Sequence, residues 1–198
     1  MDVAEKVVYN PAVPYVGIIP GGLKPGKTVI IQGLVLATGG ERFEIDFISG
    51  LLVAGDHVDN FALHFNPRFN EKHIVVNSLC DNQWGKEERH PLQGKLEKGQ
   101  SFDIRILVAS TGYKISVNGK PLCEFKHRLS LSDVKVLHVK GCVQLDLIEF
   151  SDPEDCEMRS SVLLEILRWP FREHKINLKL DVRNRLLKFV QIHVDFYQ

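Results

Sequence analysis

Short runs of alternating apolar and polar side chains recur along the chain up to Phe150, and turn-forming residues separate them. Alternation with a period of two is typical of a half-buried β-strand, because successive side chains of a strand point to opposite faces. We expect strands at 28–36, 42–47, 60–69, 73–79, 102–108, 113–117, 122–125, 134–139 and 143–150. Short strands at regular intervals, with turn signals between them, predict an all-β sandwich.

Proline and glycine refine this prediction. Residues 7–26 contain four prolines and four glycines, which indicates an extended lead-in with turns rather than a helix. Asn118-Gly119 is a strong hairpin signal between two expected strands. Pro67 lies inside the expected strand 60–69 and has no backbone N–H to donate. We therefore expect this strand at a sheet edge, or at least with the position of the missing N–H turned to solvent.

The expected strand 60–69 separates polar and apolar side chains. His64, Asn66 and Arg68 share one face, because side chains two apart in a strand point the same way. The other face carries the apolar residues Phe61, Leu63, Phe65 and Phe69. One face thus has the pattern of a core, and the other presents three directional hydrogen-bonding groups in a row. This arrangement predicts a binding site on the polar face.

The polar groups suit hydroxyl ligands better than a metal or a phosphate, because they mix donors and acceptors. Glu87 can accept from a hydroxyl and can also hold Arg68 or Arg89 in a fork. Trp84 offers a flat apolar surface, which fits the C–H face of a sugar such as galactose. Trp84 and Glu87 are an odd distance apart and would point to opposite faces of a continuous strand. We expect a bulge or bend at Gly85.

At these residues the chain resembles the galectin family of β-galactoside-binding lectins. The motif His64-x-Asn66-x-Arg68, Asn77 and Trp84-Gly85-x-Glu87-x-Arg89 occurs in the family's order. The flanks from Asn10 to Phe150 also resemble the family, most closely the N-terminal recognition domain of its tandem-repeat members.

The resemblance implies a jelly-roll β-sandwich of the galectin or concanavalin-like type. It also implies galactose contacts from the matching residues. His64, Asn66 and Arg68 would contact the 4-OH, and Asn77 and Glu87 the 6-OH. Trp84 would stack on the ring, and Arg89 would order Glu87.

Arg42, Glu44 and Asp46 lie on one face of the preceding expected strand. Two interpretations are open. The three side chains form a solvated face, or they form an extended subsite that reads sugars beyond the galactose.

The overall charge and the cysteines exclude other classes. The chain has 25 Lys+Arg and 25 Asp+Glu, so no global field recruits nucleic acid or an anionic membrane. No stretch is long and apolar enough to span a bilayer, and the N-terminus lacks the pattern of a secretory signal. The cysteines have no metal-type spacing and are expected to be reduced thiols: Cys80, Cys123, Cys142 and Cys156. We expect a cytoplasmic protein without metal or cofactor, and the resemblance implies export without a signal peptide.

Catalysis is not expected. Glu87 and Glu88 are neighbours that diverge in a strand, whereas glycosidases place two carboxylates across the scissile bond. No G-x-S-x-G elbow is present. The sequence predicts a lectin for β-galactosides of the lactose or N-acetyllactosamine type, carried on glycoproteins or glycolipids. The alternative is an intracellular protein-interaction module on the same fold.

A polar break at 151–155 ends the strand pattern. We expect a recognition domain at 1–152 and a C-terminal extension, or truncated linker, at 153–198. Residues 158–198 contain eight Lys+Arg and four Asp+Glu, a net charge of +4, mixed with apolar residues. A membrane or partner role for this segment and a weak homo-oligomer are both left open.

Overall fold

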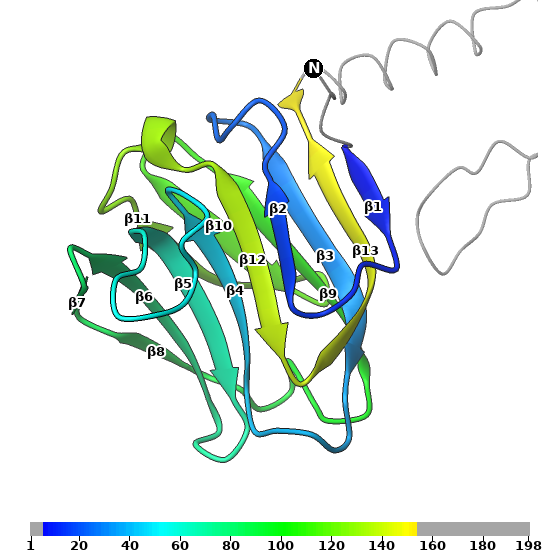
Figure 1. Cartoon of the computed structure of the whole chain (residues 1–198). Helices are drawn as coiled ribbons and strands as arrows, with labels where there is room; N and C mark the ends of the chain where they lie inside the picture. Colours follow the sequence, from blue (N-terminus) through cyan, green and yellow to red (C-terminus); the bar gives the residue numbers. More distant parts are fainter. Residues whose placement is uncertain (1–5, 154–198) are drawn as a thin grey trace, which may run out of the picture. The chain divides into compact units, whose positions relative to one another are not determined.

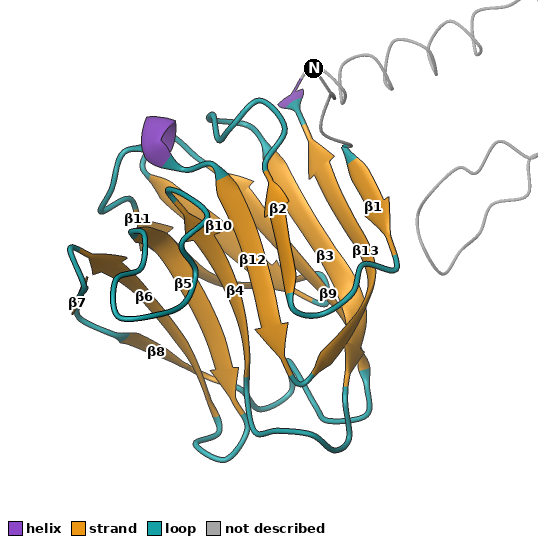
Figure 2. Cartoon of the chain, in the orientation of Figure 1, coloured by secondary structure: helices purple, strands orange, loops and turns teal. Residues whose placement is uncertain are grey.

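The computed structural model describes residues 6–153, and residues 1–5 and 154–198 lie outside that description. The predicted extension therefore falls almost wholly outside the described residues. Thirteen strands and one short 3-10 turn follow one another (Figure 2): β1 Val7–Tyr9, β2 Tyr15–Ile18, β3 Thr28–Val35, β4 Phe43–Ile48, β5 Phe61–Arg68, β6 His73–Cys80, β7 Gln83–Trp84, β8 Glu88–Pro91, β9 Ser101–Val108, β10 Gly112–Val117, β11 Lys120–Lys126, η1 Leu131–Asp133, β12 Val136–Gly141 and β13 Val143–Ser151.

The strands form two antiparallel sheets that face each other (Figure 1). One sheet has the order β1-β13-β3-β9-β10-β11. The other has the order β2-β12-β4-β5-β6-β7, and β8 also pairs with β6. The prediction of an all-β sandwich is confirmed, and each of the nine predicted strands coincides with an observed one to within two residues. In the described part of the chain, no helix is long and apolar enough to cross a membrane.

The core lies between the sheets and is built from the apolar side of each alternating strand. Phe65, Phe47 and Ile104 are fully buried there. Aromatic pairs connect the two sheets: the Phe43 ring stacks on Phe102 with centroids 5.5 Å apart, and Phe47 meets Tyr113 edge-on at 5.5 Å. Burying one such side chain contributes roughly 1.5–3 kcal/mol. The core therefore holds the inner face of β5, and the outer face of β5 is left for polar groups.

The Asn118-Gly119 hairpin is confirmed between β10 and β11. Both residues have positive φ values, 50° and 74°, as a two-residue turn that matches the twist of the strands requires.

The expectation that Pro67 marks an edge strand is wrong, because β5 lies between β4 and β6. Arg42 bridges to Arg68, so Pro67 is opposite Phe43 of β4. Pro67 has no N–H to donate to the Phe43 carbonyl, and this carbonyl accepts a hydrogen bond of 2.7 Å from Asn66 Nδ2 instead. A neighbouring side chain thus replaces the ladder bond that proline removes, and this bond fixes the orientation of Asn66.

Candidate functional site

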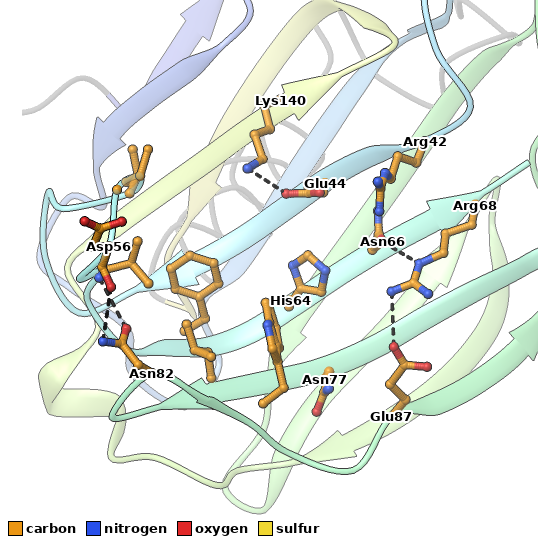
Figure 3. A pocket seen from close by; sticks show the side chains of 17 residues that line it. Arg42, Glu44, Asp56, His64, Asn66, Arg68, Asn77, Asn82, Glu87 and Lys140 are labelled. Carbon is orange, nitrogen blue, oxygen red and sulfur yellow. Dashed lines mark hydrogen bonds and ion pairs between the residues drawn. The ribbon is translucent and has the colours of Figure 1, made fainter.

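A groove of about 640 Å³ runs over the outer face of the β2-to-β7 sheet (Figure 3). Six of the seven predicted site residues line it: His64, Asn66, Arg68, Asn77, Trp84 and Glu87. The seventh, Arg89, lies behind Glu87 and is hydrogen-bonded to it. The structure therefore brings the whole motif together in one place.

The strands β5, β6, β7 and β8 and the segment between β7 and β8 supply these side chains. β5 carries the triplet from His64 to Arg68, and Asn77 of β6 is directly opposite His64. Trp84 of β7 pairs with Leu79 of β6, and Glu87 precedes the first residue of β8. Both β7 and β8 pair with β6, so residues 85–87 form the interruption that the spacing of Trp84 and Glu87 predicted.

Gly85 serves this interruption by its small size. Its φ is not in the positive range that favours glycine. A Cβ atom added at Gly85 would lie 2.7 Å from Nη1 of Arg128. The missing side chain therefore leaves room for an arginine that comes from a distant part of the sequence.

Trp84 lines the groove with 53% of its surface exposed. Its ring meets Phe61 edge-on at 5.9 Å, and its centroid lies 4.8 Å from that of His64. These contacts hold the indole beside the polar triplet. A large exposed aromatic surface next to directional polar groups is what stacking on a sugar ring requires.

Four charged side chains form a closed ring of hydrogen bonds that includes the groove residues Arg68 and Glu87. Glu87 accepts from Arg68 Nη2 at 3.1 Å and from Arg89 Nε at 2.9 Å. Glu71 accepts from Arg68 Nη1 at 3.3 Å and from Arg89 Nη1 at 3.0 Å. The hydrogen bond from Arg89, with the positive charge of Arg68, holds the pKa of Glu87 below its usual value. Glu87 is therefore a carboxylate, which accepts hydrogen bonds and does not donate them.

Glu71 was not predicted from the sequence. It lies three residues after Arg68, in the turn that leads to β6. Its spacing from Arg68 is the only sequence signal that could have identified it.

Below the groove, a buried carboxylate connects two histidines. Asp46 is fully buried, and its two oxygens contact His64 Nδ1 at 2.6 Å and His138 Nδ1 at 3.0 Å. Burial alone would raise the pKa of Asp46, but the hydrogen bonds from His138 and His64 outweigh it and lower that pKa. Because Asp46 is ionised, His64 donates from Nδ1, and its Nε2 is left as an acceptor.

These contacts correct one assignment from the sequence. Asp46 has no exposed surface and does not line the groove, so it belongs neither to a solvated face nor to the direct contacts of an extended subsite. It acts through His64. Arg42 and Glu44 do line the groove, and Glu44 pairs with Lys140 at 3.0 Å.

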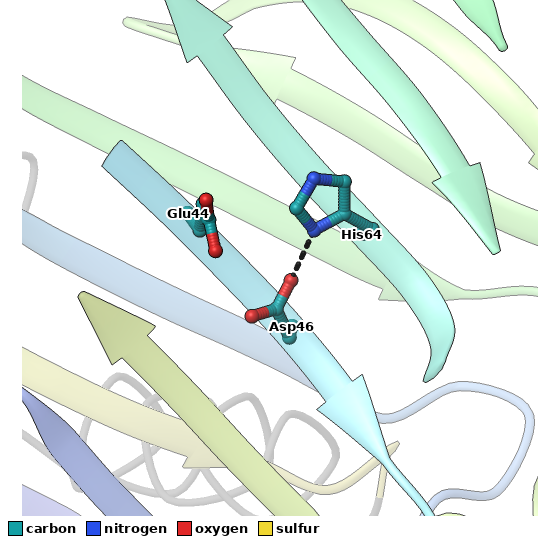
Figure 4. Close-up of side chains that lie close together, drawn as sticks. All are labelled: Glu44, Asp46 and His64. Carbon is teal, nitrogen blue, oxygen red and sulfur yellow. Dashed lines mark hydrogen bonds and ion pairs between the residues drawn. The ribbon is translucent and has the colours of Figure 1, made fainter. Parts of the chain in front are cut away.

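Figure 4 shows Glu44, Asp46 and His64, whose side-chain atoms of the kind that bind metal ions lie within 4.8 Å of one another. His64 Nδ1 and both oxygens of Asp46 are already engaged in hydrogen bonds. This geometry supports a hydrogen-bond network that orients His64.

The lowered pKa of Asp46 predicts a pH dependence of stability. Asp46 binds a proton less readily in the folded protein than in the unfolded chain. Its contribution to the free energy of unfolding is therefore complete above the ordinary pKa of 3.8 and is lost as the pH falls below that value. Urea unfolding between pH 7 and pH 2.5 should show this loss, and Asp46→Asn should be less stable at pH 7 and lose less on acidification. Asp133→Asn in the exposed turn η1 controls for the change in net charge. If the free energy of unfolding of Asp46→Asn fell with pH as steeply as that of the wild type, Asp46 would not be the ionised group that stabilises the fold.

Residues 14–150 match the family model described as galactoside-binding lectin, so the chain belongs to this family, the galectins. It is 42% identical over 143 residues to galectin-4 of Bos taurus, a match that covers 72% of this chain and 41% of that protein. It is 35% identical over 190 residues to galectin-8 of Rattus norvegicus, which covers 92% of this chain and 58% of that protein. The chain thus spans well under two thirds of the length of these relatives.

Solved structures agree with this assignment. A variant of human galectin-16 superposes with a TM-score of 0.64 at 28% identity and covers 73% of this chain and 99% of that one. The Caenorhabditis elegans galectin LEC-6 has a TM-score of 0.63 at 24% identity over 74% of this chain and 96% of that one, which shows the shared fold.

Proposed function

We propose that the protein binds β-galactosides in the groove over β4, β5 and β6, and that it does no chemistry on the sugar. The observation that carries this proposal is the convergence of His64, Asn66 and Arg68 beside the half-exposed ring of Trp84. Each of the three polar side chains is held by a second protein group, so little ordering remains when a ligand binds.

The axial 4-OH of galactose matches the polar triplet atom by atom. A hydroxyl donates one hydrogen bond and accepts two. His64 Nε2 supplies the acceptor, because Nδ1 is engaged with Asp46. Asn66 and Arg68 supply donors. Asn66 directs one amide hydrogen to Phe43 and Arg68 directs Nε to Asn66, and both retain further N–H groups for a ligand.

The 6-OH fits between Asn77 and Glu87. Asn77 Oδ1 accepts from the Ser78 N–H at 2.9 Å, and Asn77 Nδ2 donates to the Gly85 carbonyl at 2.9 Å. The second Nδ2 hydrogen can then donate to the sugar, and the Glu87 carboxylate can accept from it. Trp84 stacks on the C–H face of the ring.

A purely binding role is consistent with the charges. Glycoside hydrolysis needs a carboxylic acid with a raised pKa. In this groove the pKa of Glu87 is lowered instead, by Arg89 and Arg68. Glu87 is paired with both Arg68 and Arg89, which favours a Glu87 carboxylate that stays ionised throughout binding.

We further propose an extended subsite at Arg42 and Glu44, glycoprotein or glycolipid glycans as partners, and a cytoplasmic location with export that needs no signal peptide. The described cysteines Cys80, Cys123 and Cys142 are free thiols, which supports a reducing compartment. The competing function is an intracellular protein-interaction module, and it needs none of the sugar contacts above.

Sugar competition separates these functions. The protein should be retained on immobilised lactose and eluted by free lactose, because a site that hydrogen-bonds the axial 4-OH leaves polar groups unpaired when that hydroxyl is reversed. Cellobiose, which differs from lactose at the terminal C4, should not elute it. Elution by both sugars would refute a galactose-reading site, and a failure of retention would favour the interaction module.

We propose 1–152 as the recognition domain and 153–198 as an extension. Removing 153–198 should leave lactose affinity unchanged, because every site residue precedes Pro153, and should make the protein more monomeric and more soluble. The cut keeps Asp152, whose carboxylate lies 2.9 Å from the buried Lys27 ammonium, so a deletion from Asp152 onward, as the control, should also lose stability. Calorimetry measures the lactose affinity of the full and truncated chains, and light scattering measures their mass in solution. A loss of lactose affinity on removal of 153–198 would place the boundary elsewhere.

A further inference from the structure

Arg128 lies outside the sugar motif, in the segment between β11 and η1. Its guanidinium packs over the Phe125 ring, with Cζ 4.5 Å from the ring centroid, and so rests on the β11 end of the opposite sheet. From there it reaches β6 and the segment before β8. Nη1 donates to Asn77 Oδ1 at 3.1 Å and to Ser78 Oγ at 3.3 Å. Nη2 donates to the Lys86 carbonyl at 3.0 Å and to Glu88 Oε1 at 3.1 Å.

We propose that Arg128 is a positioning residue of the sugar site. It fixes the Asn77 amide and the backbone of residues 85–88, so that Asn77 and Glu87 meet the same sugar hydroxyl. This inference rests on the proposed galactoside function. It adds a residue that contacts no sugar and comes from the segment after β11, the edge strand of the other sheet.

The first step of the argument is the orientation of Asn77. An Asn side chain has an oxygen end and a nitrogen end of nearly the same shape, and its partners decide which end faces a ligand. Arg128 has only donors, so it must face Oδ1, and the Gly85 carbonyl must face Nδ2. The remaining Nδ2 hydrogen is the donor that a sugar hydroxyl needs. Without Arg128, the amide loses one of the groups that specify its orientation.

The second step concerns residues 85–87, which connect Trp84 to β8 and include Glu87. This segment is the interruption between β7 and β8, so the ladder bonds of β6 do not hold all of it. Arg128 holds it at the Lys86 carbonyl and at the Glu88 side chain. Gly85 is without a Cβ where the Arg128 guanidinium passes. The glycine of the motif and Arg128 therefore form one packing unit.

A role of Arg128 in stability alone explains fewer of its contacts than the positioning role does. The Arg128 and Glu88 side chains are 29% and 39% exposed, and ion pairs of that kind add little stability. Of the four acceptors of Arg128, the Asn77 oxygen and the Lys86 carbonyl directly adjoin the groups proposed to read the 6-OH.

The test compares lactose with an analogue that lacks the galactose 6-OH, titrated by calorimetry into the full chain. The wild type should prefer lactose by roughly tenfold or more, because the analogue leaves Asn77 and Glu87 unpaired. Arg128→Met should lose about tenfold in lactose affinity, with less than a twofold change for the deoxy analogue, so the preference collapses. Arg105→Met, which removes an arginine paired with Asp103 on the outer face of the other sheet, should keep the wild-type preference. An Arg128→Met protein with the full preference overturns the proposal, whatever its overall affinity.

A second variant protects the test against misfolding. Gly85→Ala places a methyl group 2.7 Å from Nη1 of Arg128, with Asn77 Oδ1 at 3.1 Å and Ser78 Oγ at 3.2 Å as the next neighbours, and should also reduce the 6-OH preference. In the Arg128→Met background the same change should cost less than in the wild type, because its shortest contact, with Nη1 of Arg128, is gone and changes that share a contact are not additive. Full additivity of the two losses would contradict the proposal.

A third measurement needs no sugar. Hydrogen exchange of the Asn77 side-chain amide, followed by NMR, should be roughly tenfold faster in Arg128→Met, since one group that orders the amide is gone. Unchanged exchange overturns the positioning role. If the wild type binds no lactose, the proposed function fails, and this exchange rate decides the role of Arg128 by itself.

Discussion

Trp84→Ala is expected to abolish retention on immobilised lactose while leaving the fold intact. The indole is 53% exposed and contributes to no core cluster in the described part of the chain, so its loss removes a stacking platform and little packing. Stacking of bases on aromatic side chains, a close physical analogue, contributes about 1–3 kcal/mol. For a weak monovalent site, the loss of this stacking energy lowers the lactose affinity below the level at which a resin retains the protein.

The control is Trp169→Ala, which removes the other tryptophan of the chain, at a position outside the described residues. It should keep lactose retention. Trp84→Phe should bind with intermediate affinity, because a smaller aromatic face remains. A folded Trp84→Ala protein that still needs lactose for elution would show that the groove is not the sugar site.

Arg68→Lys should lower lactose affinity at least tenfold, although the charge is kept. The guanidinium makes three directed contacts, to Asn66, Glu71 and Glu87, and a lysine ammonium cannot reproduce that planar fork. Asn66 and Glu87 would then lose the group that aligns them with the sugar. The change in melting temperature should be small, because the ion pairs are partly exposed and contribute little.

Calorimetry with lactose measures this loss. Arg105→Lys provides the matched control, because it is the same chemical change at an arginine whose partner is Asp103 on the other sheet. Its lactose affinity should equal that of the wild type. Equal affinities for Arg68→Lys and the wild type would place Arg68 outside the site.

The strands and the polar row of the site could be predicted because both depend on a local rule. A period of two puts His64, Asn66 and Arg68 on one face wherever the strand lies in the fold. The same rule places Phe65 in the core. Trp84, Glu87 and Arg89 were put forward from the chemistry of their side chains, and resemblance to the family then added Asn77 and the role of each residue.

What the sequence did not reveal depends on contacts between distant residues. His138 lies 92 residues from Asp46 and Arg128 lies 51 residues from Asn77, so neither contact follows from periodicity. Strand order is similarly non-local. Pro67 indicated an edge strand, but β5 is interior because the Asn66 side chain supplies the missing hydrogen bond to Phe43.

Gly85 illustrates the same limit at one position. The spacing of Trp84 and Glu87 correctly predicted an interruption there. The reason for glycine is the close approach of the Arg128 guanidinium, which no local pattern could indicate.

The most direct test of the central claim is a map of amide chemical shifts during a lactose titration of the isotope-labelled protein. The largest changes should fall on β5 from His64 to Arg68, on Asn77, on residues 84–89 and on the indole N–H of Trp84. Cellobiose at the same concentration should leave these signals in place. Lactose-induced changes confined to the outer face of β9, β10 and β11, or the absence of any change, would contradict a galactoside site in this groove.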